Sequence, residues 1–175
     1  NNLGFVYQEN KDYNEAKQWY NEAIRLKPDY VVAHHNLGLI YHLQEKYEKA
    51  EVSYKKTTKI KPDYYPVYNN LGNVLIKQGK FIEAEDCYNQ AIKFEKENPE
   101  NYNNLGVVLQ SQGKIEKAKN AYEQALIHKN DFAEAHYNLA FCLQKLNKFD
   151  EALSSYEQAL IIKPDYASAE SSMLY

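Results

Sequence analysis

The chain repeats itself every 34 residues, and this period constrains its fold more than any other feature of the sequence. An Asn-Leu pair recurs five times with no insertion or deletion between copies, and Gly or Ala follows it each time. An alanine twelve residues later and a tyrosine four residues after that keep the same register. Because several columns agree along the whole chain, the sequence predicts an array of structural repeats. The recurring asparagines are Asn2, Asn36, Asn70, Asn104 and Asn138.

The repeats are numbered from position 1 to position 34, so that the recurring asparagine occupies position 6. A single array covers residues 1–175, with complete repeats at 31–64, 65–98, 99–132 and 133–166. Residues 1–30 form a partial first repeat that lacks four positions. Residues 167–175 break the pattern, so we expect either the start of a sixth repeat or a capping helix there. Both ends of the pattern fall inside a repeat, so we expect a fragment of a longer array.

Each repeat is predicted to form two amphipathic helices. In the third repeat, the first helix carries apolar or small residues at the i, i+3, i+4, i+7 spacing of one helix face, namely Tyr68, Leu71, Gly72 and Leu75. The second helix carries a similar stripe, formed by Phe81, Ala84, Tyr88, Ala91 and Ile92. Gly79 indicates the turn between them, and Pro62 indicates where the preceding helix ends. Neither helix buries its stripe alone, so stability is expected from stacking of neighbouring repeats.

This order of an aromatic residue, Leu-Gly, Tyr, Ala, an aromatic residue, Ala and Pro in 34 residues resembles the tetratricopeptide repeat (TPR). The resemblance implies an all-α fold, an α-solenoid in which antiparallel helix pairs stack into a right-handed superhelix. Within that family, segments such as EAEDCYNQAIK look like the superhelical TPR arm of O-linked N-acetylglucosamine transferases, which also carries an asparagine ladder.

Charge and composition exclude several classes of function. The formal net charge is −3 and no Lys/Arg-rich block occurs, so we expect no binding to nucleic acid. No apolar run is long enough to cross a bilayer, so we expect no membrane insertion. Cys87 and Cys142 form neither a disulfide framework nor a metal-binding spacing. Retained thiols fit a reducing compartment, so we expect a cytoplasmic protein, with association to a cytoskeleton or cilium left open.

The sequence predicts no enzyme activity, no cofactor and no metal site. No P-loop or other phosphate-binding glycine pattern occurs. His35 and His42 share a helix face, but seven residues separate them by about 10 Å along the axis, too far for one metal ion. The carboxylates near the starts of second helices are expected to face solvent and to be stabilised by the helix dipole, rather than to act as a catalytic acid and base.

A second stripe of each first helix lies opposite the core stripe, because successive residues turn by about 100°. In TPR superhelices the first helices line the concave groove, so the resemblance implies that this stripe meets a ligand. Its positions 5, 6 and 9 carry amides with a few aromatic and aliphatic side chains. The predicted peptide-binding residues are Asn2, Asn36, Asn70, Asn104, Asn138, Asn69, Asn73, Asn103, His35, Phe5, Leu39, Val107 and Phe141.

The asparagine column has two interpretations. An Asn inside a helix lowers helix stability by about 0.6 kcal/mol relative to Ala, so its recurrence at five positions needs an explanation. A column of amides can hydrogen-bond the backbone of an extended peptide whatever its side chains. Alternatively, Asn at position 6 is inherited by duplication, or bonds to a neighbouring helix.

The resulting prediction is a scaffold that binds an extended peptide segment of a partner protein. One alternative is the substrate-recognition arm of an O-GlcNAc-type glycosyltransferase. Another is an architectural subunit of a large ciliary or cytoskeletal assembly. The Lys and Arg residues that TPR domains use at positions 2 and 6 to clamp chaperone tails are absent, because position 2 is Val32, Pro66, Glu100 or Glu134.

Overall fold

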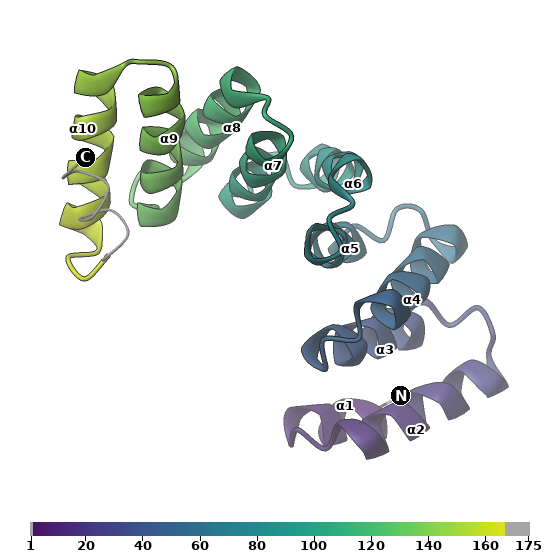
Figure 1. The fold of residues 1–175 in the computed structure, drawn as a ribbon. Coiled ribbons are helices and arrows are strands. Elements are labelled where there is room, and N and C mark those ends of the chain that lie inside the picture. Colours follow the sequence, from purple (N-terminus) through teal and green to yellow (C-terminus); the bar gives the residue numbers. More distant parts are fainter. Residues whose placement is uncertain (1, 167–175) are drawn as a thin grey trace. The chain divides into compact units, whose positions relative to one another are not determined.

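A computed structural model describes residues 2–166, which form ten α-helices and no strand (Figure 1). The all-α repeat architecture predicted from the 34-residue period is therefore confirmed, while residues 167–175, predicted as a sixth repeat or a capping helix, lie outside the described range. The helices are α1 (Asn2–Glu9), α2 (Tyr13–Leu26), α3 (Val31–Leu43), α4 (Tyr47–Ile60), α5 (Pro66–Lys77), α6 (Phe81–Phe94), α7 (Pro99–Ser111), α8 (Ile115–His128), α9 (Ala133–Lys145) and α10 (Phe149–Ile162).

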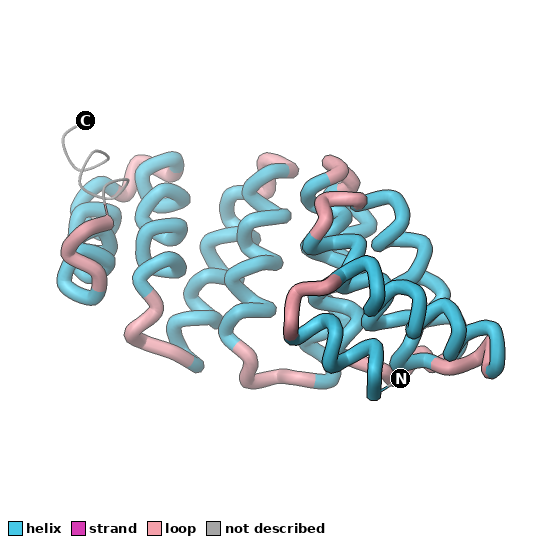
Figure 2. The backbone as a smooth tube through the Cα atoms, turned by 90° about the horizontal axis from the view of Figure 1, so that it is seen from below, coloured by secondary structure: helices cyan, strands magenta, loops and turns pink. Residues whose placement is uncertain are grey.

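Contacts within the chain separate it into two compact parts, and the boundary falls inside α6 between Cys87 and Tyr88. The part up to Cys87 is called the N-terminal half, and the part from Tyr88 the C-terminal half. In both halves, successive helices are joined by short loops, which Figure 2 shows in pink.

Position 15 of every repeat takes a left-handed backbone conformation in the turn between the two helices. Gly79 and Gly113 have φ angles of 72° and 74°, as the sequence suggests. Lys11, Glu45 and Asn147 adopt the same conformation, with φ angles of 60°, 56° and 61°. A non-glycine residue in this region is strained by about 1 kcal/mol or more. The turn geometry is therefore imposed by the helix pair, and glycine relieves its strain in two repeats.

Each helix pair is held together by a tyrosine ring that packs against a small residue. Tyr20 and Tyr54 at position 24 are fully buried. A Cβ atom on Gly4 would lie 2.8 Å from Cε1 of Tyr20, and one on Gly38 would lie 2.6 Å from Cδ1 of Tyr54. In the last repeat, Ala140 takes the glycine position and packs with Tyr156 in one buried cluster. Position 8 carries a small residue because the position-24 tyrosine ring occupies the space that a larger side chain would need.

Neighbouring repeats pack through the first helix of one and the second helix of the repeat before it. In the N-terminal half, Leu37 and Ile40 of α3 share a buried cluster with Ala16 and Tyr20 of α2. In the C-terminal half the same arrangement recurs between α9 and α8, where the buried residues are Ala118, Ala121, Tyr122, Leu139, Cys142 and Leu143. Positions 7 and 10 of a first helix thus form the surface that the preceding repeat covers.

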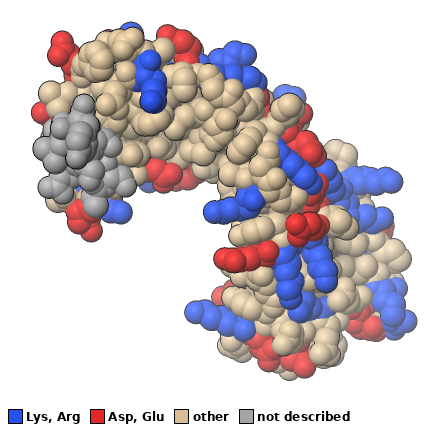
Figure 3. Space-filling view, viewed as in Figure 1, with Lys and Arg blue, Asp and Glu red and all other residues tan. Residues whose placement is uncertain are grey.

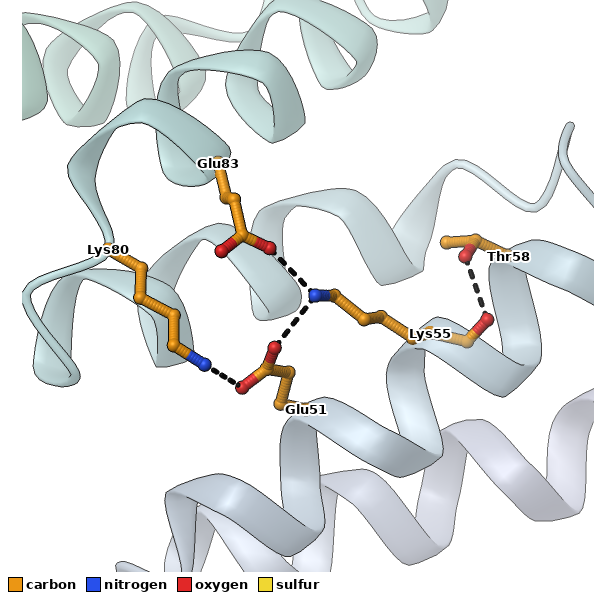
Figure 4. Close-up of polar contacts among 5 residues, drawn as sticks. All are labelled: Glu51, Lys55, Thr58, Lys80 and Glu83. Carbon is orange, nitrogen blue, oxygen red and sulfur yellow. Dashed lines mark hydrogen bonds and ion pairs between the residues drawn. The ribbon is translucent and has the colours of Figure 1, made fainter.

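Ion pairs also join the second repeat to the third (Figure 4). Glu51 of α4 lies 2.8 Å from Lys55 and 2.7 Å from Lys80, and Lys55 lies 2.7 Å from Glu83 of α6. Burial alone would raise the pKa of Glu51, but hydrogen bonds from Lys55 and Lys80 lower it to about 2. Figure 3 shows the two signs of charge alternating over the part of the N-terminal half that contains α4.

We expect acid to weaken the N-terminal half through Glu51. Its pKa lies below the ordinary value of 4.5, so its stabilising effect is complete above pH 4.5 and is lost as the pH falls towards 2. Urea unfolding of the wild type and of Glu51→Gln, followed by circular dichroism, should give free energies that differ most at pH 7, differ less at pH 3 and converge as the pH reaches about 2. Glu22→Gln serves as the control, because the Glu22–Arg25 pair is exposed and therefore screened by solvent. A Glu51→Gln difference that stays constant with pH contradicts this prediction.

Candidate binding face of the first helices

First helices lie side by side within each half, with α3 beside α5 and α7 beside α9. We call the thirteen predicted residues at positions 5, 6 and 9 the first-helix face. Asn2 and Phe5 of α1 are exposed, and most of the other members are half-buried. Asn103 is the exception, because only 2% of its surface is exposed. Most of the face is therefore accessible to a ligand, and Asn103 is not.

A chain of hydrogen bonds crosses the first three repeats on this face. Asn70 Nδ2 lies 3.0 Å from His35 Nε2, and His35 Nδ1 lies 3.3 Å from Asn36 Oδ1. Asn36 Nδ2 then donates to the Tyr20 hydroxyl at 3.2 Å, which donates to Gln8 Oε1 at 3.0 Å. One proton assignment satisfies all four bonds, with His35 neutral and protonated on Nδ1. Burial lowers the pKa of His35, while its bond to Asn36 opposes that shift, so the neutral form is favoured.

The C-terminal half contains a shorter version of this chain. Asn138 Nδ2 donates to Asn103 Oδ1 at 3.1 Å, so a position-6 amide again bonds position 5 of the repeat before it. Asn103 Nδ2 in turn donates to Glu134 Oε1 at 3.3 Å. In both halves, the recurring asparagine connects neighbouring first helices.

Position 5 has a different role where it is aromatic. The His35 ring lies 5.8 Å from the Tyr54 ring and 5.4 Å from the Tyr64 ring, measured between ring centres. Tyr137 occupies the same position in the last repeat and packs in the same way against the rings of Tyr156 and Tyr166, at 5.7 and 5.1 Å. An aromatic residue at position 5 therefore packs between positions 24 and 34 of its own repeat.

A family model decides the family of this chain. The model of the Cilia and flagella-associated protein 70 C-terminal domain, a TPR family, matches residues 2–173. The chain belongs to this family. No curated protein sequence matches this TPR domain significantly.

Solved structures with the same fold are numerous and distant in sequence. The crystal structure of YrrB, described as a TPR protein with an unusual peptide-binding site, is 20% identical with a TM-score of 0.91, over 99% of this chain and 90% of that one. The structure of MamA is 24% identical with a TM-score of 0.88, and the match covers 99% of this chain and 98% of that one. PilF of Pseudomonas aeruginosa is 22% identical with a TM-score of 0.78, and the match covers 97% of this chain and 85% of that one. At this identity the similarity shows the fold alone.

The position-24 tyrosines of the TPR domain do more than pack, which the sequence did not reveal. Tyr20, Tyr122 and Tyr156 each donate a hydrogen bond to a glutamine at position 12 of the same repeat, at 3.0, 3.0 and 3.4 Å respectively. In the second repeat, His42 replaces that glutamine. The buried Tyr54 hydroxyl has no hydrogen-bond partner among the described residues. Glutamine recurring twelve residues before tyrosine was the signal for this pairing.

The structure bears on the two interpretations of the asparagine column. Asn36, Asn70 and Asn138 bond to the preceding repeat, which is the local bond that the second interpretation expects. These amides nevertheless stay half-exposed, so contact with a peptide remains a prediction for them. Among the apolar members of the face, Phe5 is 51% exposed, and the ammonium group of Lys145 lies 5.3 Å from the centre of the Phe141 ring.

The described residues contain neither a cluster of metal ligands nor a cysteine thiolate. In residues 2–166, no three His, Cys, Asp or Glu side chains gather where a metal ion would fit. Burial raises the pKa of the Cys87 thiol to about 12 and that of Cys142 to about 11, so neither is a thiolate at neutral pH. Within the same range, every helix is too short or too polar to cross a bilayer.

We expect Tyr54→Phe and Tyr122→Phe to have different effects on stability. Removing the Tyr122 hydroxyl breaks its bond to Gln110, so the domain should lose about 1 kcal/mol of unfolding free energy. Removing the unpartnered Tyr54 hydroxyl should leave stability unchanged or raise it, because no protein hydrogen bond is lost. Urea unfolding of the two variants at pH 7 provides the measurement. Equal losses of stability would show that the two hydroxyl groups have equivalent partners in solution.

Proposed function

We propose that the first helices of this TPR domain bind an extended segment of a partner protein. The observation that carries the proposal is a row of half-exposed amides whose orientation is already fixed by bonds between repeats, such as those of Asn36 and Asn70. An asparagine amide offers two donor hydrogens and an acceptor oxygen, so one bond to a neighbouring repeat leaves further capacity. Groups held in place before binding lose less entropy when a ligand arrives.

Aliphatic side chains beside the amides support a peptide ligand. Leu39 and Val107 at position 9 are half-buried, one in each half, and Phe5 is exposed. An extended peptide presents its backbone groups and its side chains in alternation, so it can bond to amides and place apolar side chains on such residues. The solved structure of YrrB, which has the same fold, is described as having a peptide-binding site, and this supports the proposal.

A second candidate is an architectural role in a ciliary assembly, because the matching family is described from a cilia- and flagella-associated protein. In that case the partner would be another subunit, and crosslinks to second helices rather than first helices would favour it. The alternative of a glycosyltransferase arm rests on sequence resemblance, and a nucleotide-sugar-binding domain in the same polypeptide would favour it.

Leu39→Asp tests the proposal in the N-terminal half. Leu39 is preferable to the asparagines, because alanine at Asn36 or Asn70 would also break bonds between repeats. The probes are peptides selected from a random phage-displayed library by the wild-type domain. A carboxylate in place of Leu39 should weaken binding of these peptides at least tenfold in calorimetry, because it places an unpaired charge beside apolar peptide atoms.

Val52→Asp provides the matched control, because Val52 is 70% exposed on the second helix α4. It adds the same charge outside the first-helix face and should leave binding unchanged. Peptides sensitive to Val52→Asp and indifferent to Leu39→Asp would place the binding site on the second helices. Selection of no binding peptide would also count against the proposal.

A further inference from the structure

The side of α3 and α5 that carries the first-helix face continues towards the C-terminal ends of these helices, where its side chains become apolar and basic. Positions 9, 12 and 13 of one helix are three and four residues apart, so they share one side of it. Because α3 and α5 contact each other in the N-terminal half, these positions of the two helices form one patch. We call it the α3–α5 patch, and its residues are Leu39, His42, Leu43, Asn73, Ile76 and Lys77.

Three aliphatic side chains give the α3–α5 patch an accessible apolar surface. Leu43 is 54% exposed, and Leu39 and Ile76 are half-buried. In the C-terminal half, position 12 is glutamine in both repeats, and each glutamine accepts a hydrogen bond from a buried tyrosine. The α3–α5 patch is therefore less polar than its counterpart in the other half, and it suits an apolar side chain of an extended segment.

His42 offers two ring nitrogens beside these aliphatic side chains. Its ring is half-buried and packs edge-on against the ring of Tyr47 in α4, with 6.1 Å between the ring centres. Neither nitrogen forms a hydrogen bond with another residue in the range 2–166. A neutral imidazole has one donor and one acceptor, and a protonated imidazole has two donors. His42 can therefore bind a polar group of a ligand without giving up a bond within the protein.

Lys77 is a second donor without a partner in this patch. Its side chain is exposed, and its ammonium forms no ion pair with any carboxylate of the described helices and loops. Burial lowers the pKa of His42, and the charge of Lys77 lowers it further, so the two side chains are near neighbours. Lys145 occupies the same position in the last repeat, where its ammonium lies over the Phe141 ring instead. Lys77 is thus available to an anionic group.

The charges around the α3–α5 patch favour an acidic ligand. With both histidines neutral, Lys77 is the single charged side chain at positions 2, 5, 6, 9, 12 and 13 of α3 and α5. On α1, position 13 is Glu9, whose charge acts on Tyr20 and would repel an acidic group there. A carboxylate beside Lys77 would be attracted by the ammonium, and it would also stabilise the protonated form of His42.

We propose that the α3–α5 patch selects an acidic residue of the bound segment and holds its carboxylate between His42 and Lys77. Alternate side chains of an extended segment point to the same side, so the residue two positions away lies on Leu39, Leu43 and Ile76 and is apolar. This inference rests on the function proposed for the first-helix face and adds the chemical class of its ligand. It uses positions 12 and 13, whereas the clamp for chaperone tails requires bases at positions 2 and 6.

Phage selection with two versions of the domain tests which residues the patch selects. Peptides selected by the wild type should be enriched in Asp or Glu two residues from an apolar residue. Those selected by Lys77→Glu should be enriched in Lys or Arg at that place, because the charge of the patch is reversed. Lys59→Glu provides the matched control, because Lys59 is exposed on the second helix α4 and has no ion pair in the described structure. It should select the same peptides as the wild type.

A peptide from the wild-type selection then gives a quantitative measurement. Replacing its acidic residue by Asn or Gln should weaken binding about tenfold in calorimetry, because a charge-assisted hydrogen bond is lost. Lys77→Glu should weaken binding of the unchanged peptide by more than that, while Lys59→Glu should leave it unchanged. Salt at 0.5 M should reduce the difference between the acidic peptide and its amide version, because it screens the charges.

The pKa of His42 reports whether the carboxylate reaches the imidazole. In the free protein this pKa lies below its ordinary value of 6.5. A bound carboxylate should raise it, so binding takes up a proton and strengthens as the pH falls from 7.5 to 5.5, where the peptide carboxylate, with a pKa of about 4, stays ionised. His42→Gln should remove this pH dependence, and it should fold because other repeats carry glutamine there. Nuclear magnetic resonance of the His42 ring protons measures the pKa with and without peptide.

Several outcomes overturn the inference, and they separate it from the function on which it rests. Selected peptides without acidic enrichment, equal binding to the wild type and Lys77→Glu, or a His42 pKa unchanged by the peptide each overturn it. If the same peptides are weakened by Leu39→Asp, the proposed binding to the first-helix face stands without this preference. Peptides that respond to Val52→Asp and not to Leu39→Asp overturn both, as does selection of no peptide.

Discussion

The close packing of a tyrosine ring on a small residue sets the spacing of the two helices in each repeat. Gly38 has no side chain because the Tyr54 ring fills that space, and Ala140 shows that one methyl group is the most that the column carries. Once the ring is in place, its hydroxyl reaches position 12 of the same repeat, as in the bond from Tyr122 to Gln110. In the first repeat, the Tyr20 hydroxyl also accepts a hydrogen bond from the side-chain amide of Asn36 in the next repeat. One side chain thus joins packing within a repeat to bonding between repeats.

The sequence was sufficient to predict the helix pairs and most of their limits, because those depend on local signals. The apolar stripes and the prolines after second helices are visible without knowledge of neighbouring repeats. The backbone conformation at position 15 could be predicted from sequence in only two repeats. Gly79 and Gly113 indicate a left-handed turn, but nothing in Lys11, Glu45 or Asn147 does. In those repeats the packing of the helix pair determines the backbone conformation and imposes its strain.

For the first-helix face, the sequence predicted which residues lie on the first helices but not which hydrogen bonds they form. The bond from Asn138 to Asn103 joins residues 35 positions apart, so it depends on how adjacent repeats cross, which no residue pattern specifies. Position 103 appeared equivalent to the other amides, yet Asn103 is almost fully buried. Its side chain is bonded on both sides, to Asn138 and to Glu134. It contributes to the face by orienting Asn138 rather than by contacting a ligand.

Single differences between repeats change the bonding of the next repeat. Position-6 Asn36 donates to the Tyr20 hydroxyl, but position-6 Asn70 bonds to His35 instead, and the Tyr54 hydroxyl is left without a protein partner. The Tyr54 hydroxyl lacks a partner because His42 stands where glutamine accepts the tyrosine hydroxyl in the first, fourth and fifth repeats. Because stability in such arrays is a sum of repeat and interface terms, these differences make the interfaces unequal in strength. The amides that bond two repeats together are also those that we propose as contacts for a peptide, so a peptide bound at Asn70 would act on the joint with the second repeat. Peptide binding at this face would then be coupled to the stiffness of that joint through a shared side chain.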